Sequence, residues 1–228
     1  MLIIKDLVAA YAKVSVLDNL NLTIEPNLIH GLVGLNGSGK TTLFNAIYGF
    51  IKSKRGSICW NGQPVLRRDI AFLETQNYFY SNITGREYLQ LFLTKNTSFD
   101  LEIWQDLFKL PLDDLIENYS TGMKKKLAIL GVLKLDKPIL LLDEPFNGID
   151  IETSRIIKVL LEKLKQRNKT IIVSSHILET LTNTCDYIHY LESNKIKTTY
   201  DKGSLQNIDQ DIFKELEKRT SELIDNAI

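Results

Sequence analysis

The chain has 228 residues, and its 28 Lys and Arg residues balance 28 Asp and Glu residues, so its formal net charge is zero. This balance argues against a nucleic-acid partner, because surfaces that bind nucleic acids are basic. Hydrophobic residues make up 44% of the chain and charged residues 25%, which disfavours intrinsic disorder. A chain of this length buries roughly 70–75% of its unfolded surface on folding and needs no disulfide scaffold.

The two cysteines, Cys59 and Cys185, lie far apart in apolar segments, as is typical of core thiols in a reducing compartment. The N-terminus lacks the basic start and apolar stretch of a signal peptide. Nowhere does an apolar run approach the roughly 20 residues that cross a bilayer. We therefore expect a cytoplasmic protein.

In chain order, short apolar runs alternate with helix-length segments, a pattern typical of parallel strands joined by crossover helices. The expected strands are 2–8, 21–24, 29–33, 57–60, 70–74, 139–142, 170–174 and 196–200. The runs 139–142 and 170–174 are rich in Leu or β-branched residues, which favours central strands buried on both faces. The sequence predicts an α/β fold with a mostly parallel central sheet.

The pattern changes between residues 81 and 118, where apolar residues recur at helical spacing and Pro111 interrupts the helices. We expect a small helical lobe, residues 81–135, inserted into a core formed by residues 1–80 and 136–200. A C-terminal tail, residues 201–228, should contain an amphipathic helix with Ile212, Phe213 and Leu216 on one face.

A glycine-rich loop follows the expected strand 29–33 and fits the P-loop pattern from Gly34 to Thr41. Glycines let successive N–H groups converge on phosphate oxygens, and the start of the following helix adds partial positive charge. Lys40 should reach the β- and γ-phosphates, and the Thr41 hydroxyl is a ligand suited to Mg²⁺. The expected phosphate contacts are Asn36, Gly37, Ser38, Gly39, Lys40, Thr41 and Thr42.

Two carboxylates end the apolar strand 139–142, at the sheet edge where open α/β folds bind ligands. Consecutive residues point in opposite directions, so the two acids can have separate roles. Asp143 is suited to hold Mg²⁺ through water, and Glu144 is suited to polarise an attacking water. The alternative is a strand end with two solvated acids.

Five further segments complete an ordered set. Tyr11 precedes the glycine-rich loop, Gln76 follows the strand 70–74, and Tyr119-Ser120-Thr121-Gly122-Met123 ends the helical lobe. Phe146-Asn147-Gly148-Ile149-Asp150 follows the acidic pair, and His176 closes Ser174-Ser175-His176. From Leu2 to Tyr200 this set resembles the nucleotide-binding subunit of an ATP-binding cassette (ABC) transporter. The resemblance implies a P-loop NTPase core with antiparallel N-terminal strands and an inserted helical subdomain.

The resemblance also implies ATP and Mg²⁺ as ligands and two cassettes that meet head to tail around two ATP molecules. Tyr11 would stack on adenine, and Gln76 would contact Mg²⁺-bound water. Ser120 and Gly122 would face the γ-phosphate held by the partner cassette. His176 would steady the γ-phosphate and the attacking water. The expected catalytic residues are thus Lys40, Glu144 and His176, and the expected metal-site residues are Thr41, Gln76 and Asp143.

Each of these roles has a plainer alternative. Ser120 suits a helix N-cap, a role compatible with phosphate contact; Tyr11 suits a strand edge and Gln76 an ordinary loop. Asp150 would act across the dimer.

Thr121 and Met123 replace the Gly and Gln that are common in the family signature, and the Tyr-Ser start with Gly-Met-Lys resembles exporter-type cassettes. The sequence leaves the effect of Thr121 on turnover open, since a Cβ at this position can alter how closely the backbone approaches phosphate.

The implied partners are a separate transmembrane permease, at the cytoplasmic face of the membrane, and a second, identical cassette; no nucleic acid is expected. The main alternative is a soluble cassette that acts on chromosomes or ribosomes. Chromosome-type members carry long coiled coils before the signature, and translation-type members usually carry two cassettes, features this chain lacks. A third possibility, a scaffold without useful hydrolysis, is disfavoured by Glu144 and His176.

Three other patterns stay open or structural. Eight of the chain's 20 aromatic residues lie between Tyr78 and Phe108, and we expect some to form the core of the lobe and others a groove for a permease helix. Lys124-Lys125-Lys126 is interpreted as a solvated helix face rather than a lipid patch. His30 and His189 have no motif context, and we interpret both as structural.

Overall fold

The computed structural model describes residues 1–11, 14–93, 99–205, 208, 220–221 and 224, which form two sheets. The smaller sheet is antiparallel, in the order β2-β1-β4-β5, with β1 (Leu2–Tyr11), β2 (Val14–Ile24), β4 (Arg55–Trp60) and β5 (Gln63–Pro64). The larger sheet has the order β10-β9-β3-β8-β7-β6. Its strands are β3 (Ile29–Val33), β6 (Ile70–Leu73), β7 (Ile139–Asp143), β8 (Thr170–Ser175), β9 (Tyr187–Glu192) and β10 (Lys195–Asp201). All are parallel except β10, which pairs antiparallel with β9.

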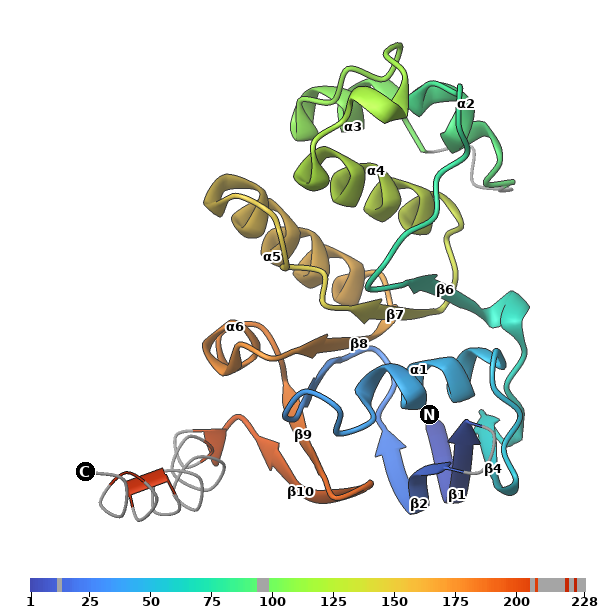
Figure 1. The fold of residues 1–228 in the computed structure, drawn as a ribbon, viewed down its shortest axis with the longest axis vertical. Helices are drawn as coiled ribbons and strands as arrows, with labels where there is room; N and C mark the ends of the chain where they lie inside the picture. Colours follow the sequence, from blue (N-terminus) through green and yellow to red (C-terminus); the bar gives the residue numbers. More distant parts are fainter. Residues whose placement is uncertain (12–13, 94–98, 206–207, 209–219, 222–223, 225–228) are drawn as a thin grey trace.

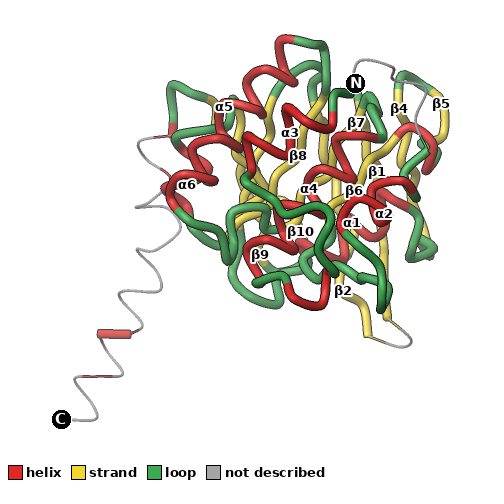
Figure 2. Tube along the Cα trace, turned by 90° about the horizontal axis from the view of Figure 1, so that it is seen from above, coloured by secondary structure: helices red, strands yellow, loops and turns green. Residues whose placement is uncertain are grey.

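Helices cover both faces of the larger sheet. They are α1 (Lys40–Tyr48), α2 (Gly85–Gln90), α3 (Leu101–Phe108), α4 (Thr121–Lys134), α5 (Ile151–Gln166) and α6 (Leu178–Thr182), with 3-10 turns at Arg67–Asp69 and Ile116–Asn118. Figure 1 shows α1 beside the antiparallel sheet, α5 and α6 on the other side, and α2, α3 and α4 together beyond β6. The view from above in Figure 2 shows the helices around the strands.

Strand alternation explains why two cores form. In β7, Ile139 and Leu141 pack with α1 and the antiparallel sheet, whereas Leu140 and Leu142 pack with the helices on the opposite face. A strand with apolar residues on both faces has to lie between two layers, as the sequence predicted for this run and for β8. The central sheet is therefore fixed on both sides, and its strand ends are held in place.

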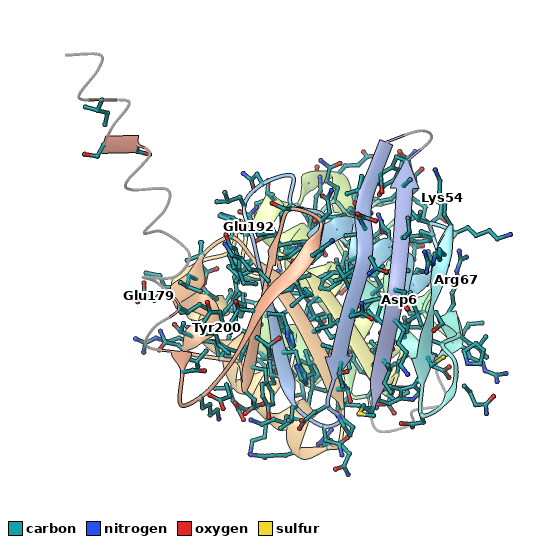
Figure 3. The ribbon with its side chains drawn as sticks, turned by 90° about the horizontal axis from the view of Figure 1, so that it is seen from below. Asp6, Lys54, Arg67, Glu179, Glu192 and Tyr200 are labelled. Carbon is teal, nitrogen blue, oxygen red and sulfur yellow. The ribbon has the colours of Figure 1, made fainter. Side chains whose placement is uncertain are left out.

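The predicted fold class is confirmed, with an antiparallel sheet and a mostly parallel one. Strands β1 and β2 are longer than the expected runs 2–8 and 21–24, because register shifts absorb polar residues such as Asp6 and Asn19, both with positive φ. Strand β9 was not among the expected strands. Figure 3 shows the strands from below, with Asp6 and Tyr200 labelled.

Three further expectations concern Pro111, the two cysteines and the C-terminal helix. Pro111 follows α3, which ends at Phe108 with Lys109 in a left-handed conformation, so the helical lobe is interrupted where expected. Cys185 is buried and Cys59 is half-buried, and both are free thiols. The predicted helix with Ile212, Phe213 and Leu216 lies outside the described residues.

Candidate active site

Four segments meet at the carboxyl edge of the larger sheet. The glycine-rich loop follows β3, Thr75 follows β6 closely, Asp143 and Glu144 end β7, and His176 follows β8. These four strands are parallel, so their carboxyl ends lie at one edge. Ligands of open α/β sheets bind at this edge. Residues distant in the sequence are thereby brought to one place.

The glycine-rich loop forms a turn that only glycine fits at two points. Gly39 has a φ of +107°, and a Cβ there would lie 3.0 Å from the Leu17 side chain. A Cβ on Gly34 would lie 2.5 Å from the Leu191 carbonyl oxygen. Helix α1 begins immediately after, and its first turn carries no acidic residue. The N–H groups and partial positive charge of this helix start are therefore available to an anion.

Lys40 folds back over the loop. Its ammonium donates hydrogen bonds to the carbonyl oxygens of Gly34 at 2.7 Å and Leu35 at 3.3 Å. Burial lowers the pKa of Lys40, while the nearby Glu144 and Asp143 carboxylates act to raise it. A cation held between a phosphate cradle and two acids fits the predicted contact with phosphate.

Asp143 is fully buried and accepts hydrogen bonds from three hydroxyl groups. Thr41 donates to its Oδ2 at 2.8 Å, Thr75 donates to the same oxygen at 2.6 Å, and Ser174 donates to Oδ1. The hydroxyl of Thr41 and the carboxylate of Asp143, both predicted as metal-site groups, are thus adjacent. Sequence reasoning missed Thr75, although its position directly after a strand and before Gln76 was a signal.

Glu144 and His176 lie together. His176 Nδ1 is 2.9 Å from Glu144 Oε2, and the Glu144 N–H donates to Ser174 Oγ at 3.0 Å. Glu144 has a φ of +50°, a left-handed conformation that residues other than glycine rarely adopt. Such backbone outliers concentrate at functional sites. The predicted pair of catalytic side chains is therefore formed within one chain.

A cavity of about 370 Å³ lies over these groups, and its size is in the range of small-molecule sites. It is lined by Val16, Asn36, Gly37, Gly39, Lys40, Thr41, Thr42, Thr75, Asp143 and Glu144. Within the described residues, the Ser38 hydroxyl oxygen is buried beside it without a hydrogen-bond partner. A nucleoside triphosphate with Mg²⁺ fits this donor set, because loop N–H groups and Lys40 match phosphate, and hydroxyl and carboxylate oxygens match Mg²⁺.

Within the described residues, no group of three or more His, Cys, Asp or Glu side chains could hold a metal by itself. Mg²⁺ usually keeps water and phosphate ligands and takes only one or two protein ligands, so Thr41 and Asp143 are enough. Gln76, the third predicted metal-site residue, is exposed and does not line the cavity. Its contact with Mg²⁺-bound water stays a prediction.

Tyr11 lies at the end of β1 with 48% of its surface exposed. Its hydroxyl accepts a hydrogen bond from Asn45 of α1 at 3.2 Å. The ring is therefore held beside the helix that begins in the glycine-rich loop, and about half of the side chain is exposed. Tyr11 is not among the cavity-lining residues, so adenine stacking stays a prediction.

The signature segment lies at the start of α4. Ser120 is the N-cap, and its hydroxyl accepts a hydrogen bond from the Met123 N–H at 3.2 Å. A Cβ on Gly122 would lie 3.1 Å from the carbonyl oxygen of Gly148. Ser120 is exposed and neither residue lines the cavity. The structure thus brings the other predicted groups together at one place. Four predicted residues lie outside it: Ser120 and Gly122, which were assigned to the partner's nucleotide, and Tyr11 and Gln76.

The interpretation of Lys124-Lys125-Lys126 as a solvated helix face is wrong for two of the three lysines. Lys125 is only 7% exposed, and its ammonium lies close to the main-chain oxygens of Glu74 and Asp143. Burial lowers the pKa of Lys125 to about 8. Lys126 pairs with Asp150 at 3.3 Å. The missed signal is helical spacing, because position 125 shares a stripe with buried Ala128, Ile129 and Val132.

Asp150 caps α5. Its carboxylate accepts hydrogen bonds from the Thr153 N–H and hydroxyl, and these bonds lower the pKa of Asp150 to about 2. Within one chain, therefore, Asp150 connects the start of α5 to Lys126 of α4. Its expected action across a dimer stays a prediction.

The fold and the site together define a P-loop nucleotide-binding protein with two carboxylates beside the loop. The family model described as ABC transporter matches residues 17–147, which is more than half of the chain. The chain belongs to the ABC transporter family, as the ordered motifs predicted, and is an ATPase. No helix among the described residues has the length and apolar character to span a membrane.

Curated relatives are similar over most of the chain. The ABC transporter ATP-binding protein YtrB of Bacillus subtilis is 30% identical over 84% of this chain and 68% of its own length. The lantibiotic transport ATP-binding protein SrtF of Streptococcus pyogenes is 29% identical over 92% and 95%. The bacitracin transport ATP-binding protein BcrA of Bacillus licheniformis is 31% identical over 84% and 66%.

Solved structures share the fold. The ATP-binding subunit of an ABC transporter superposes with a TM-score of 0.81 at 26% identity, covering 95% of this chain and 93% of that one. The cassette MJ0796, described as a dimer in a post-hydrolysis state with ADP and phosphate, gives 0.79 at 23% identity, covering 89% and 99%. The second comparison shows the fold alone.

Proposed function

We propose that this chain is the ATP-binding and hydrolysing subunit that dimerises on ATP and powers a separate membrane permease in the export direction. The observation that carries the proposal is the division of the motifs. The cavity holds the phosphate cradle, Asp143 and Glu144, whereas the signature residues Ser120 and Gly122 lie outside it. A second copy placed head to tail would supply the missing helix start to each nucleotide.

The proposed reaction is transfer of the γ-phosphoryl group to water. The water oxygen attacks the γ-phosphorus while Glu144 accepts a proton from the water. The bond between this phosphorus and the β–γ bridging oxygen breaks, which releases ADP and inorganic phosphate. His176 orients Glu144 through their 2.9 Å contact. Lys40 neutralises charge on the phosphates. Mg²⁺, held through Thr41 and Asp143, would supply further neutralisation of phosphate charge.

The names of relatives support transport as the coupled process. SrtF is named as a lantibiotic transport ATP-binding protein and BcrA as a bacitracin transport ATP-binding protein. This chain also keeps the Tyr119-Ser120 and Gly122-Met123-Lys124 pattern of the exporter-like signature. We propose attachment to the cytoplasmic face of the membrane through the permease.

The aromatic stretch offers a surface for that partner. Tyr88 and Phe108 are buried in the helical lobe, but Tyr78 and Tyr80 are 76% and 54% exposed with ring centroids 5.3 Å apart. Aromatic side chains are enriched where proteins bind each other. We propose that this tyrosine pair, on the loop between β6 and α2, contacts the permease.

The test uses Glu144→Gln, which keeps the shape of the side chain but removes the base. We expect ATP binding to persist and hydrolysis to fall about 10²–10⁴-fold, the range for loss of a general base. With ATP and Mg²⁺ present, the trapped variant should sediment as a dimer, because hydrolysis no longer reopens it.

Lys40→Ala in the Glu144→Gln background is the matched control, and it should stay monomeric because the phosphates lose their cation. Near-normal turnover in Glu144→Gln would overturn the assignment of the base. Monomers only, at nucleotide concentrations that saturate binding, would overturn the proposed head-to-tail site.

A further inference from the structure

The peptide group that joins Asp143 to Glu144 is contacted from two sides. Its carbonyl oxygen lies 3.4 Å from the Lys125 ammonium, and its N–H donates to Ser174 Oγ at 3.0 Å. The residue that follows this peptide, Glu144, has a φ of +50°, a left-handed conformation that costs free energy for most L residues. The orientation of this peptide therefore depends on groups outside the strand, one on α4 and one on β8.

Lys125 is an unusual residue for its location. It is nearly fully buried, and no ion pair with a carboxylate within 4.0 Å is found for it among the described residues. In the part of the chain that the structure describes, its ammonium contacts the main-chain carbonyl oxygens of Asp143 and Glu74, the latter at 3.5 Å, and the Asp143 and Glu144 carboxylates act on it from a greater distance. A buried charge is costly unless it is well paired, and an unbranched apolar side chain would fill the same space without that cost. Helix packing alone therefore does not account for a lysine here.

We propose that Lys125 is a positioning residue for ATP hydrolysis, which holds the peptide 143–144 so that Glu144 faces His176. The inference rests on the proposed role of Glu144 as the base. Ser174 holds the N–H end of the same peptide and Lys125 holds the carbonyl end. Without the ammonium, the peptide is free to rotate towards the ordinary extended conformation, and the Glu144 carboxylate moves away from His176.

The position of Lys125 also joins the signature segment to the base. Ser120 caps α4, and Lys125 lies on the next turn of the same helix, so the two move together. The Glu74 carbonyl, the second contact, lies two residues before Gln76. When a second copy's nucleotide displaces the start of α4, the Lys125 ammonium therefore transmits this displacement to two places, the loop after β6 and Glu144. Such a contact gives each site a physical means to respond to the other.

The test compares Lys125→Met, Lys125→Arg and Lys163→Met as full chains. Lys125→Met keeps the length of the side chain but removes its charge, and we expect kcat to fall about tenfold, since misplacement of a reacting group by about 1 Å costs up to about 10²-fold. The KM for ATP should stay unchanged, because the phosphate cradle is intact. Lys125→Arg should recover most of kcat. Lys163→Met changes an exposed lysine of α5 in the same way and should behave as the wild type.

Thermal unfolding and ATP binding separate this role from a structural one. A positioning role predicts that Lys125→Met unfolds no earlier than the wild type and binds ATP equally well. Wild-type kcat in Lys125→Met would overturn the proposal, as would a joint loss of folding stability, ATP affinity and kcat that Lys125→Arg fails to repair. Glu144→Gln is assayed alongside. Normal turnover in Glu144→Gln would contradict the assignment of Glu144 as the base. If turnover is lost in Glu144→Gln but unchanged in Lys125→Met, only the positioning role is overturned.

Discussion

His30 and His189 form a buried pair between neighbouring strands β3 and β9. Their rings are parallel with centroids 5.3 Å apart, and His30 Nδ1 lies 3.0 Å from His189 Nε2. The outer nitrogens reach the Glu25 carbonyl at 3.0 Å and the Thr199 hydroxyl at 2.9 Å. One proton between the facing nitrogens satisfies both neutral rings, whereas a further proton would create a buried charge without a partner. The interpretation of both residues as structural agrees with this arrangement.

The pair should make stability depend on pH. Burial lowers the pKa of His30 to about 4 and that of His189 to about 3, against about 6.5 in an unfolded chain. The unfolded state therefore binds more protons as pH falls below 6.5, and the stability present at neutral pH is progressively lost. For one such histidine the loss reaches about 2 kcal/mol at pH 5. Urea unfolding between pH 5 and 7 measures it.

His189→Gln provides the control, since it keeps a polar side chain and removes one titrating ring. Its unfolding free energy should vary less steeply over the same range. Asp186 acts to raise the pKa of His30, and Tyr187 stacks on the His30 ring, so neither group produces the expected loss. An equal pH slope in the variant and the wild type would contradict the prediction.

Which residues could be predicted depends on how their chemistry is encoded. Lys40, Thr41, Asp143 and Glu144 were predictable because each function belongs to a motif of adjacent residues at a strand end. Lys125 was not, because its partner atoms are main-chain oxygens of segments 18 and 51 residues away. Main-chain contacts leave no trace in side-chain patterns. Only the burial stripe of α4 pointed to an inward side chain.

At the scale of elements, α4 makes a close contact with the turn that follows α2. Gly131 lies inside α4, where the Phe92 ring packs so closely that a Cβ would lie 2.6 Å from the nearest ring carbon. Phe92 in turn packs on Tyr88 of α2 at 5.1 Å. Alanine inside a helix normally stabilises relative to glycine by about 0.5–1 kcal/mol. Here the contact reverses the sign.

Gly131→Ala should therefore destabilise the protein by about 1–3 kcal/mol, the usual cost of overpacking a core. Denaturant unfolding measures the change in free energy. Phe92→Leu combined with Gly131→Ala should be less destabilised than the sum of the two single variants, because the smaller side chain relieves the clash. A stabilised Gly131→Ala variant would show that the helices move apart freely and would contradict the packing described here.

The elements themselves were predicted where the hydrophobic pattern was clean. Strands β3, β7 and β8 lie where the sequence predicted them, because most of their residues are apolar and both of their faces are buried. The pattern was weaker in β1 and β2, where polar residues at register shifts shortened the expected runs. Strand β9 carries His189 on its buried side, and a titratable residue there hid the strand from hydropathy.

At the scale of the molecule, the fold places the glycine-rich loop, Asp143, Glu144 and His176 at one edge of one sheet, and it places the signature segment at the start of α4. The first arrangement, the set of groups at the sheet edge, is formed by contacts within one chain, so the order of the motifs could predict it. The second copy that would complete the site lies beyond any single chain. ATP binding, however, needs only the first arrangement, and it can be tested apart from dimerisation.

ATP with Mg²⁺ should stabilise the whole molecule by mass action, since the cradle forms only in the folded state. At about 100 times Kd the gain is about 2.7 kcal/mol, which for a domain of this size raises Tm by about 5–10 °C. Lys40→Ala should abolish the shift, and Lys52→Ala, an exposed lysine just beyond α1, should retain it. Thermal scans with and without nucleotide measure both. A full shift in Lys40→Ala would mean that the triphosphate binds elsewhere, because no other described lysine lines the cavity.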